Sequence, residues 1–272
     1  MRLLAVTLLL AACTDYDLNR KAEEPAPEDT DTGEPVVDTG DTAAEDTGDT
    51  GDTVLVPDTG EVATEAVYIN TDSTLYSFDP ATGVAMRIGD FLEGREPVAG
   101  GMTDIAISLD GIMYGGSFDA LYRINPSTGE CTFVATLDDT MTGLTFVSDG
   151  RLVGAGEAVS FVDTRTGRLT TLVPGGEYST SGDIIGLPDG MLYWTVTGGD
   201  QLVQVDPDSG DTRRRGTIGV SAIYGLGYAY GDLYGFTSAG EIVTIDPTTG
   251  RPGSTEALSG RWWGATTNPV LW

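Results

Sequence analysis

The phrase "LYRINPSTGE" at residues 121–130 decides the fold, because four close variants of it recur along the chain. The variants are "LYSFDPATGV" at 75–84, "VSFVDTRTGR" at 159–168, "LVQVDPDSGD" at 202–211 and "IVTIDPTTGR" at 242–251. Their Asp or Asn residues occupy positions 79, 125, 163, 206 and 246, so the repeat has a period near 40. A repeat of that length built from short strands is typical of a propeller or a similar array.

Each repeat contains signals for two successive hairpins. In the phrase itself, alternating apolar residues predict a strand, and Asp-Pro-x-Thr-Gly predicts a turn because Pro presets φ and Gly supplies a positive φ. A second turn signal, Asp-Gly or Gly-Asp between apolar runs, lies upstream, as in "ISLDGIMY" and "YAYGDLYG". Each complete unit therefore predicts four antiparallel strands without a helix, which is one propeller blade.

The two ends of the repeat region predict how the ring closes. The first copy lacks its first strand, whereas the last copy is followed by the extra segment "RWWGATTNPVLW". We predict the innermost strands at 102–109, 141–148, 182–188, 222–230 and 262–268, the last one completing the first blade. We expect Trp262, Trp263 and Trp272 to pack this closure. The predicted fold over 63–272 is thus all-β, a five-bladed propeller closed by its C-terminal strand, which removes exposed sheet edges.

The repeated phrase resembles the LYxxDPxTG phrase of the large bacterial superfamily of PQQ-like and YVTN-like propellers. This resemblance covers residues 63–272 and implies the fold, but the phrase is a turn and implies no site. Quinoprotein members of that group also carry tryptophan-docking motifs and usually eight blades. The present repeats lack both features, so we expect no cofactor.

The N-terminal stretch "MRLLAVTLLLAAC" has the charge and apolar run of a secretory signal, and it is too short to span a bilayer. Its last four residues, "LAAC", resemble a bacterial lipobox. The resemblance implies that 1–12 is a lipoprotein signal peptide and that Cys13 carries lipid, the several acyl chains that stable anchoring requires. We therefore expect an extracytoplasmic location in the bacterial cell envelope, at the outer membrane or cell surface. An ordinary signal peptide with an incidental cysteine is the alternative.

Residues 13–62 form an acidic, Asp/Thr/Gly-rich segment that we predict to be a disordered linker, because it offers little apolar surface to bury. "DTDTGE" at 29–34 begins like an EF-hand loop, but Gly occupies the fifth and twelfth positions, so calcium binding by the linker stays open. The whole chain has 42 acidic and 14 basic residues. A net charge of −28 disfavours nucleic acid and favours cations, cationic peptides or neutral ligands such as sugars.

Few residues can carry chemistry. The chain has no histidine, and its two cysteines, Cys13 and Cys131, form no CxxC pair, so the commonest general base and thiolate zinc sites are excluded. Asp104 and Asp183 fall at equivalent positions of predicted innermost strands, which line the channel of a propeller. They are either a channel ligand site or acceptors of backbone hydrogen bonds. We assign no catalytic residue and no metal site.

Our first hypothesis is a non-enzymatic binding module, monomeric and tethered to membrane lipid through Cys13, with an unknown protein or glycan as ligand. Two alternatives remain. One is a carboxylate-dependent enzyme such as a glycosidase or a glutaminyl cyclotransferase, which would use the axial acids. The other is a structural envelope protein. Propellers host all three, so the fold alone does not choose between them.

Overall fold

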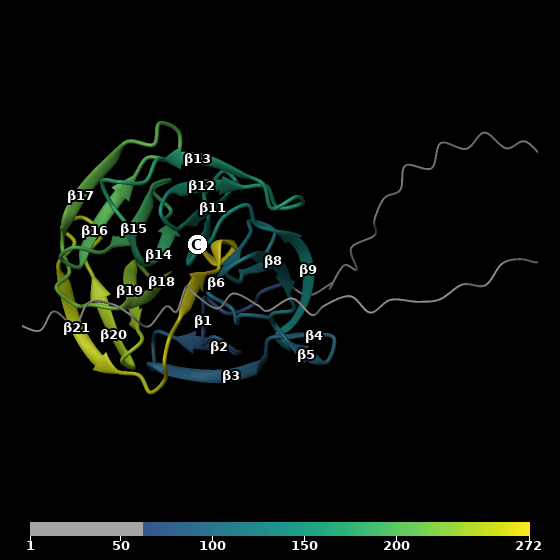
Figure 1. Ribbon diagram of the computed structural model, residues 1–272. Helices are drawn as coiled ribbons and strands as arrows, with labels where there is room; N and C mark the ends of the chain where they lie inside the picture. Colours follow the sequence, from purple (N-terminus) through teal and green to yellow (C-terminus); the bar gives the residue numbers. More distant parts are fainter. Residues whose placement is uncertain (1–61) are drawn as a thin grey trace, which may run out of the picture. The chain divides into compact units, whose positions relative to one another are not determined.

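A computed structural model describes residues 62–272, in which five antiparallel sheets stand around a common axis (Figure 1). The predicted five-bladed propeller is confirmed. The predicted signal peptide, Cys13 and the linker up to residue 61 lie outside the described residues. Within residues 62–272, no helix has the length and apolar character needed to cross a bilayer.

Each blade runs from an inner strand at the axis to an outer strand at the rim (Figure 1). In that order blade 1 has β22 (Gly264–Thr267), β1 (Val67–Asn70), β2 (Thr74–Asp79) and β3 (Val84–Asp90). Blade 2 has β6 (Asp104–Ile107), β7 (Met113–Gly116), β8 (Ala120–Ile124) and β9 (Glu130–Thr136). Blade 3 has β10 (Gly143–Phe146), β11 (Leu152–Ala155), β12 (Val159–Val162) and β13 (Leu169–Val173). Blade 4 has β14 (Thr180–Gly186), β15 (Leu192–Val196), β16 (Gln201–Val205) and β17 (Thr212–Thr217). Blade 5 has β18 (Ile223–Ala229), β19 (Asp232–Thr237), β20 (Glu241–Ile245) and β21 (Pro252–Ala257).

The C-terminal strand closes the ring as the sequence predicts. β22 pairs antiparallel with β1 over its whole length, and the chain ends in a short 3-10 helix, η1 (Pro269–Leu271), near the centre of the ring (Figure 1). Trp262 is 1% exposed, and its indole lies edge-on to Tyr76 at 5.3 Å between ring centroids. Trp272 is 44% exposed, so the expectation that it packs the closure is wrong.

The hydrophobic core lies between neighbouring sheets. Every strand except β17, β21 and the short β4 and β5 buries residues, and each apolar cluster joins two blades. At the closing junction, Phe78 of β2 packs edge-on against Phe236 of β19, with ring centroids 5.1 Å apart. The side chains that a single sheet cannot cover on its own are therefore covered by the next blade, which makes the closed ring the stable unit.

The repeated phrase forms the turn between the third and outer strands of every blade, which we call the corner turn. The corner turns are residues 79–83, 125–129, 163–167, 206–210 and 246–250. The first side chain of each turn accepts a backbone N–H two residues later, as in Asp79 Oδ1 with the amide of Ala81 at 2.9 Å. Hydrogen bonds within the turn lower the pKa of the Asp that begins each of four of these turns. The recurring acid is thus a turn-forming group.

The connection between blades 1 and 2 contains a feature that the sequence analysis missed. Two short strands, β4 (Leu92–Glu93) and β5 (Glu96–Pro97), form a hairpin there. β4 adds in parallel to β9, which extends the sheet of blade 2 to six strands. The outer edge of β9 is therefore covered at these positions, which limits edge-to-edge pairing with another chain.

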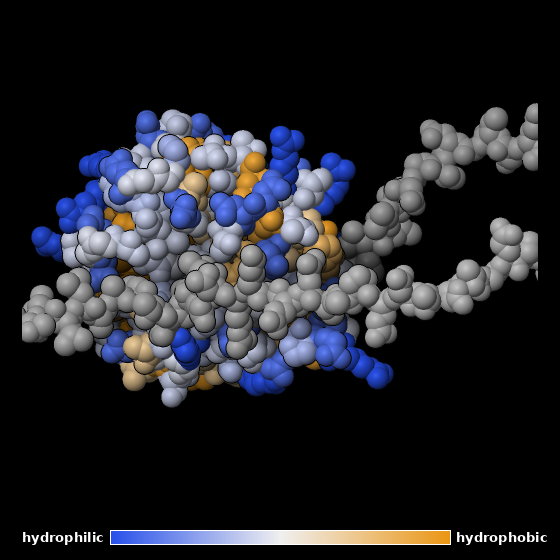
Figure 2. All heavy atoms as spheres, in the orientation of Figure 1, coloured by the Kyte–Doolittle hydropathy of each residue, from blue (hydrophilic) through white to orange (hydrophobic). Residues whose placement is uncertain are grey.

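On the face seen in Figure 2, hydrophilic side chains dominate the periphery of the ring. Hydrophobic side chains show only as small separate patches between them. Scattered apolar residues of this kind are normal on protein surfaces, and the coloured part of this view shows no large apolar patch.

Candidate functional site

The inner strands bring Asp104 and Asp183 together at the propeller axis. Both residues are 0% exposed, and their carboxyl groups lie close enough to influence each other's pKa. Asp104 belongs to β6 in blade 2 and Asp183 to β14 in blade 4. The structure therefore places both acids on inner strands, at the equivalent positions that their alignment predicts. Their role as a ligand site stays a prediction.

Asp104 joins three blades through backbone hydrogen bonds. Its Oδ1 accepts the N–H of Ile105 at 2.8 Å and the N–H of Ala265, in blade 1, at 3.1 Å. Its Oδ2 accepts the N–H of Leu144, in blade 3, at 2.6 Å. A single carboxyl thus serves donors from its own blade and from the blade on either side.

Asp183 does the same for the other two blades. Its Oδ1 accepts the N–H of Ile184 at 2.5 Å, and its Oδ2 accepts the N–H of Leu226 in blade 5. One inner-strand N–H from each blade therefore ends on one of two carboxyls, five donors in all. Buried backbone N–H groups without acceptors are costly, and these two acids remove that cost at the crowded axis.

The other three axial positions require glycine. Gly264, Gly143 and Gly225 each precede one of the donors, and they have no side chain to occupy the axis. A Cβ at Gly264 would collide with Oδ1 of Asp104, and one at Gly143 would come within 3.0 Å of the Cα of Asp183. The axis thus has room for two acidic side chains only, and glycine occupies the equivalent position of the other three inner strands.

Burial of the pair keeps a proton at the axis. Desolvation, followed by the charge of Asp183, raises the pKa of Asp104 well above its usual range. Desolvation also raises the pKa of Asp183 to about 8. Two buried carboxyl groups this close cannot both be charged without a large free-energy penalty, so the pair retains a proton at neutral pH.

We expect Asp104→Asn to destabilise the protein by about 1–3 kcal/mol near pH 5, because the amide keeps one oxygen but leaves the Leu144 N–H without an acceptor. The penalty should shrink as pH rises from about 4 towards 8. A raised folded-state pKa means that the native protein holds protons that the unfolded chain releases, so wild-type stability falls over that window, and the variant has one such group fewer. Urea unfolding at pH 5, 6.5 and 8 measures this. A penalty constant over that range would contradict the retained proton.

Asn70 is an axial residue that the sequence analysis missed. It is fully buried at the end of β1, where its Nδ2 donates to the carbonyls of Thr71 and Met102 at 2.9 and 3.3 Å. Its Oδ1 has no hydrogen-bond partner and lies over Gly264 beside Asp104. No turn or repeat signal in the sequence marks Asn70.

Cys131, near the start of the outer strand β9, is a core residue. It is 6% exposed, and burial raises the pKa of its thiol to about 12. A thiol with so high a pKa is not a nucleophile at neutral pH. Among residues 62–272 there is also no group of three His, Cys, Asp or Glu side chains arranged to hold a metal ion.

An open groove of about 690 Å³ lies on blade 3 and is lined by three arginines, Arg151, Arg165 and Arg168. Arg151 stacks over Phe161 at 4.5 Å and pairs with Asp149 at 2.5 Å and Asp208 of blade 4 at 2.7 Å. These ion pairs balance Arg151 locally and tie two blades together. A second groove, between blades 5 and 1, has no basic lining residue.

No family model matches the sequence, and no curated protein matches it. Many solved structures are similar. A chain in a nidogen/laminin complex gives a TM-score of 0.53 at 14% identity, covering 76% of this chain and 99% of that one. The WD40 propeller domain of Doa1 gives 0.49 at 14% identity, covering 75% and 83%. Virginiamycin B lyase from Staphylococcus aureus gives 0.45 at 16% identity, covering 73% and 69%. At these identities the likeness concerns the fold alone.

Proposed function

We propose that this protein is a membrane-tethered, extracytoplasmic lipoprotein whose propeller is a non-enzymatic binding module. One observation carries the binding half of the proposal. Asp104 and Asp183, the acids best placed for catalysis in the sequence, are fully buried and engaged with backbone N–H groups of all five blades. A substrate has no access to them, so the rigid ring is better suited to presenting its surface to a partner.

The tethering half rests on the lipobox-like "LAAC" before the acidic segment. We expect Cys13→Ser to move the protein from the membrane fraction to the soluble fraction, or to block removal of residues 1–12, because no lipid can then be attached. Fractionation and immunoblotting in a bacterial host measure both outcomes. Cys131→Ser is the matched control, since that thiol lies in the propeller core. A Cys13→Ser protein that is still processed and still membrane-bound would contradict the lipoprotein assignment.

The binding half is tested by incubating the purified full chain with envelope extract and with an array of glycans. The proposal expects a saturable partner whose affinity is unchanged by Asp104→Asn, because the axial acid does not face the ligand. No saturable partner from either source would count against a binding module.

A carboxylate-dependent enzyme remains the second candidate, because a raised carboxyl pKa is what a general acid needs. A general acid must be accessible to its substrate, and the burial of both acids argues against such access. Hydrolysis of a glycan or peptide by the wild type, lost in a folded Asp183→Asn protein, would favour the enzyme over the binding module.

A further inference from the structure

Four of the five junctions between blades are closed at the rim by the corner turn. In each, the turn of one blade packs on the outer strand of the preceding blade, so closely that its glycine has no room for a side chain. A Cβ at Gly129 would lie 2.8 Å from the carbonyl oxygen of Asp90, and one at Gly250 would lie 2.7 Å from the nitrogen of Gly216. Gly167 and Gly210 make the same close approach to blades 2 and 3.

The fifth junction, between blade 5 and blade 1, is open. No atom comes within 4 Å of a Cβ built on Gly83, the corresponding glycine of blade 1. Every residue of β21, the outer strand that this turn would cover, is exposed. A groove of about 320 Å³ occupies the place between them.

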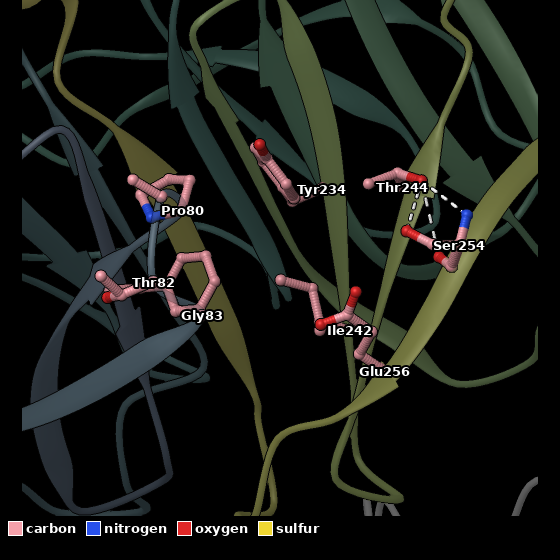
Figure 3. A pocket seen from close by; sticks show the side chains of 10 residues that line it. Pro80, Thr82, Gly83, Tyr234, Ile242, Thr244, Ser254 and Glu256 are labelled. Carbon is pink, nitrogen blue, oxygen red and sulfur yellow. Dashed lines mark hydrogen bonds between the residues drawn. The ribbon is translucent and has the colours of Figure 1, made fainter.

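Figure 3 shows the two walls of this groove, which we call the junction groove. Pro80, Thr82 and Gly83 of blade 1 lie on one side, and Thr244, Ser254 and Glu256 of blade 5 lie on the other. Tyr234 and Ile242 lie between them, and Phe78 completes the lining with Ala81. The groove thus combines an apolar floor with polar walls.

Charge and burial restrict what the junction groove can hold. Glu256 is the only charged side chain in its lining. Thr244 and Ser254 are hydrogen-bonded to each other at 3.3 Å, which leaves the carboxylate as the dominant polar group of its wall. Phe78 is 3% exposed and Tyr234 is 9% exposed, so neither ring offers an open face on which a sugar could stack.

We propose that the junction groove binds a lysine or arginine side chain carried by an extended peptide segment of a partner protein. At the other four junctions a polypeptide segment, the corner turn, fills the equivalent place, so the shape suits a chain. The aliphatic stem of Lys or Arg covers the more exposed apolar part of the lining, at Pro80 and Ala81, while its charge reaches Glu256. The acidic surface of the protein adds long-range attraction for such a peptide. This inference rests on the proposed binding function and names the chemistry of its partner.

The test uses the full ¹⁵N-labelled chain and the probe peptide acetyl-Gly-Lys-Gly-amide. We expect saturable amide shifts at Gly83, Ser254 and Glu256, and weaker binding of the norleucine peptide, which has an apolar stem without the charge. Glu256→Gln should weaken binding of the lysine peptide about five-fold, which corresponds to an ion pair worth about 1 kcal/mol. Glu241→Gln, on the same hairpin but outside the groove lining, removes the same charge and should leave the affinity unchanged.

A second variant tests the groove itself. Ser254→Trp fills the space from an exposed position, so it should abolish the localised shifts while the remainder of the spectrum stays folded. Three outcomes would each overturn the proposal: shifts spread over other blades, equal losses of affinity for Glu256→Gln and Glu241→Gln, or binding that survives Ser254→Trp. The proposed binding function is separate from this outcome. If the wild type, Glu256→Gln and Ser254→Trp all still bind a saturable envelope partner, the binding module stands and only the junction groove fails.

Discussion

A chain that ends at Arg261 is expected to lose most or all of its cooperative stability. The deletion removes β22 and η1, so β1 loses the strand that pairs with it from Gly264 to Thr267. It also removes the buried Trp262, and truncation of a single buried Trp costs about 3–5 kcal/mol. Total stabilities of about 5–15 kcal/mol cannot easily absorb that loss together with an exposed strand edge.

Circular dichroism melting of both proteins measures the effect, and a shorter deletion supplies the control. Removing only residues 270–272 takes away side chains that are 44–54% exposed, with no strand pairing, and should change stability by about 0.5 kcal/mol or less. Equal melting temperatures for the chain ending at Arg261 and the full chain would show that blade 1 is stable without β22.

The double replacement Asp104→Ala and Asp183→Ala should be about as damaging. It leaves five inner-strand N–H groups without acceptors at the axis. Each orphaned donor costs about 1–3 kcal/mol, so the total is on the order of the whole stability of a domain. We expect no cooperative unfolding transition for the double variant.

The two single alanine variants compare how much each acid contributes to the free energy of unfolding. Asp104→Ala should cost more than Asp183→Ala, because it strips three N–H groups of their acceptor and the other strips two. Asp110→Ala removes an acid from an exposed hairpin turn and is the control, with an expected change within about 0.5 kcal/mol. Urea unfolding at pH 6 provides the comparison. An Asp104→Ala protein as stable as this control would mean that the axial hydrogen bonds contribute nothing measurable.

The fold was predictable because the corner turn is a local signal. Phrases of the type Asp-Pro-x-Thr-Gly form the turn through local hydrogen bonds, so the same turn forms in every blade. The number of such phrases and their spacing therefore predict the number of blades. The β4–β5 hairpin has no such signal: it consists of two two-residue strands, and the outer edge of β9 determines where β4 lies.

The site was only partly predictable for a related reason. The alignment of inner strands placed Asp104 and Asp183 at the axis, but it did not show that Leu144, Leu226 and Ala265 donate to them, since those contacts join residues about 40 or 160 positions apart. The open junction between blades 5 and 1 was also not predictable from the sequence. The corner turn of blade 1 has nearly the sequence of the others, yet only the path of the closing chain decides whether a neighbouring strand covers Gly83.

The axial arrangement also limits how such a chain can evolve. If a repeat were duplicated, the new copy would bring one more inner-strand N–H to the centre. Here two acids and three glycines already fill that space. A sixth copy of a glycine-bearing blade would add a donor with no acceptor and widen the ring beyond the reach of the existing carboxyls. An added blade is therefore tolerated better when the copy carries its own axial acid, as a copy of blade 2 or blade 4 would.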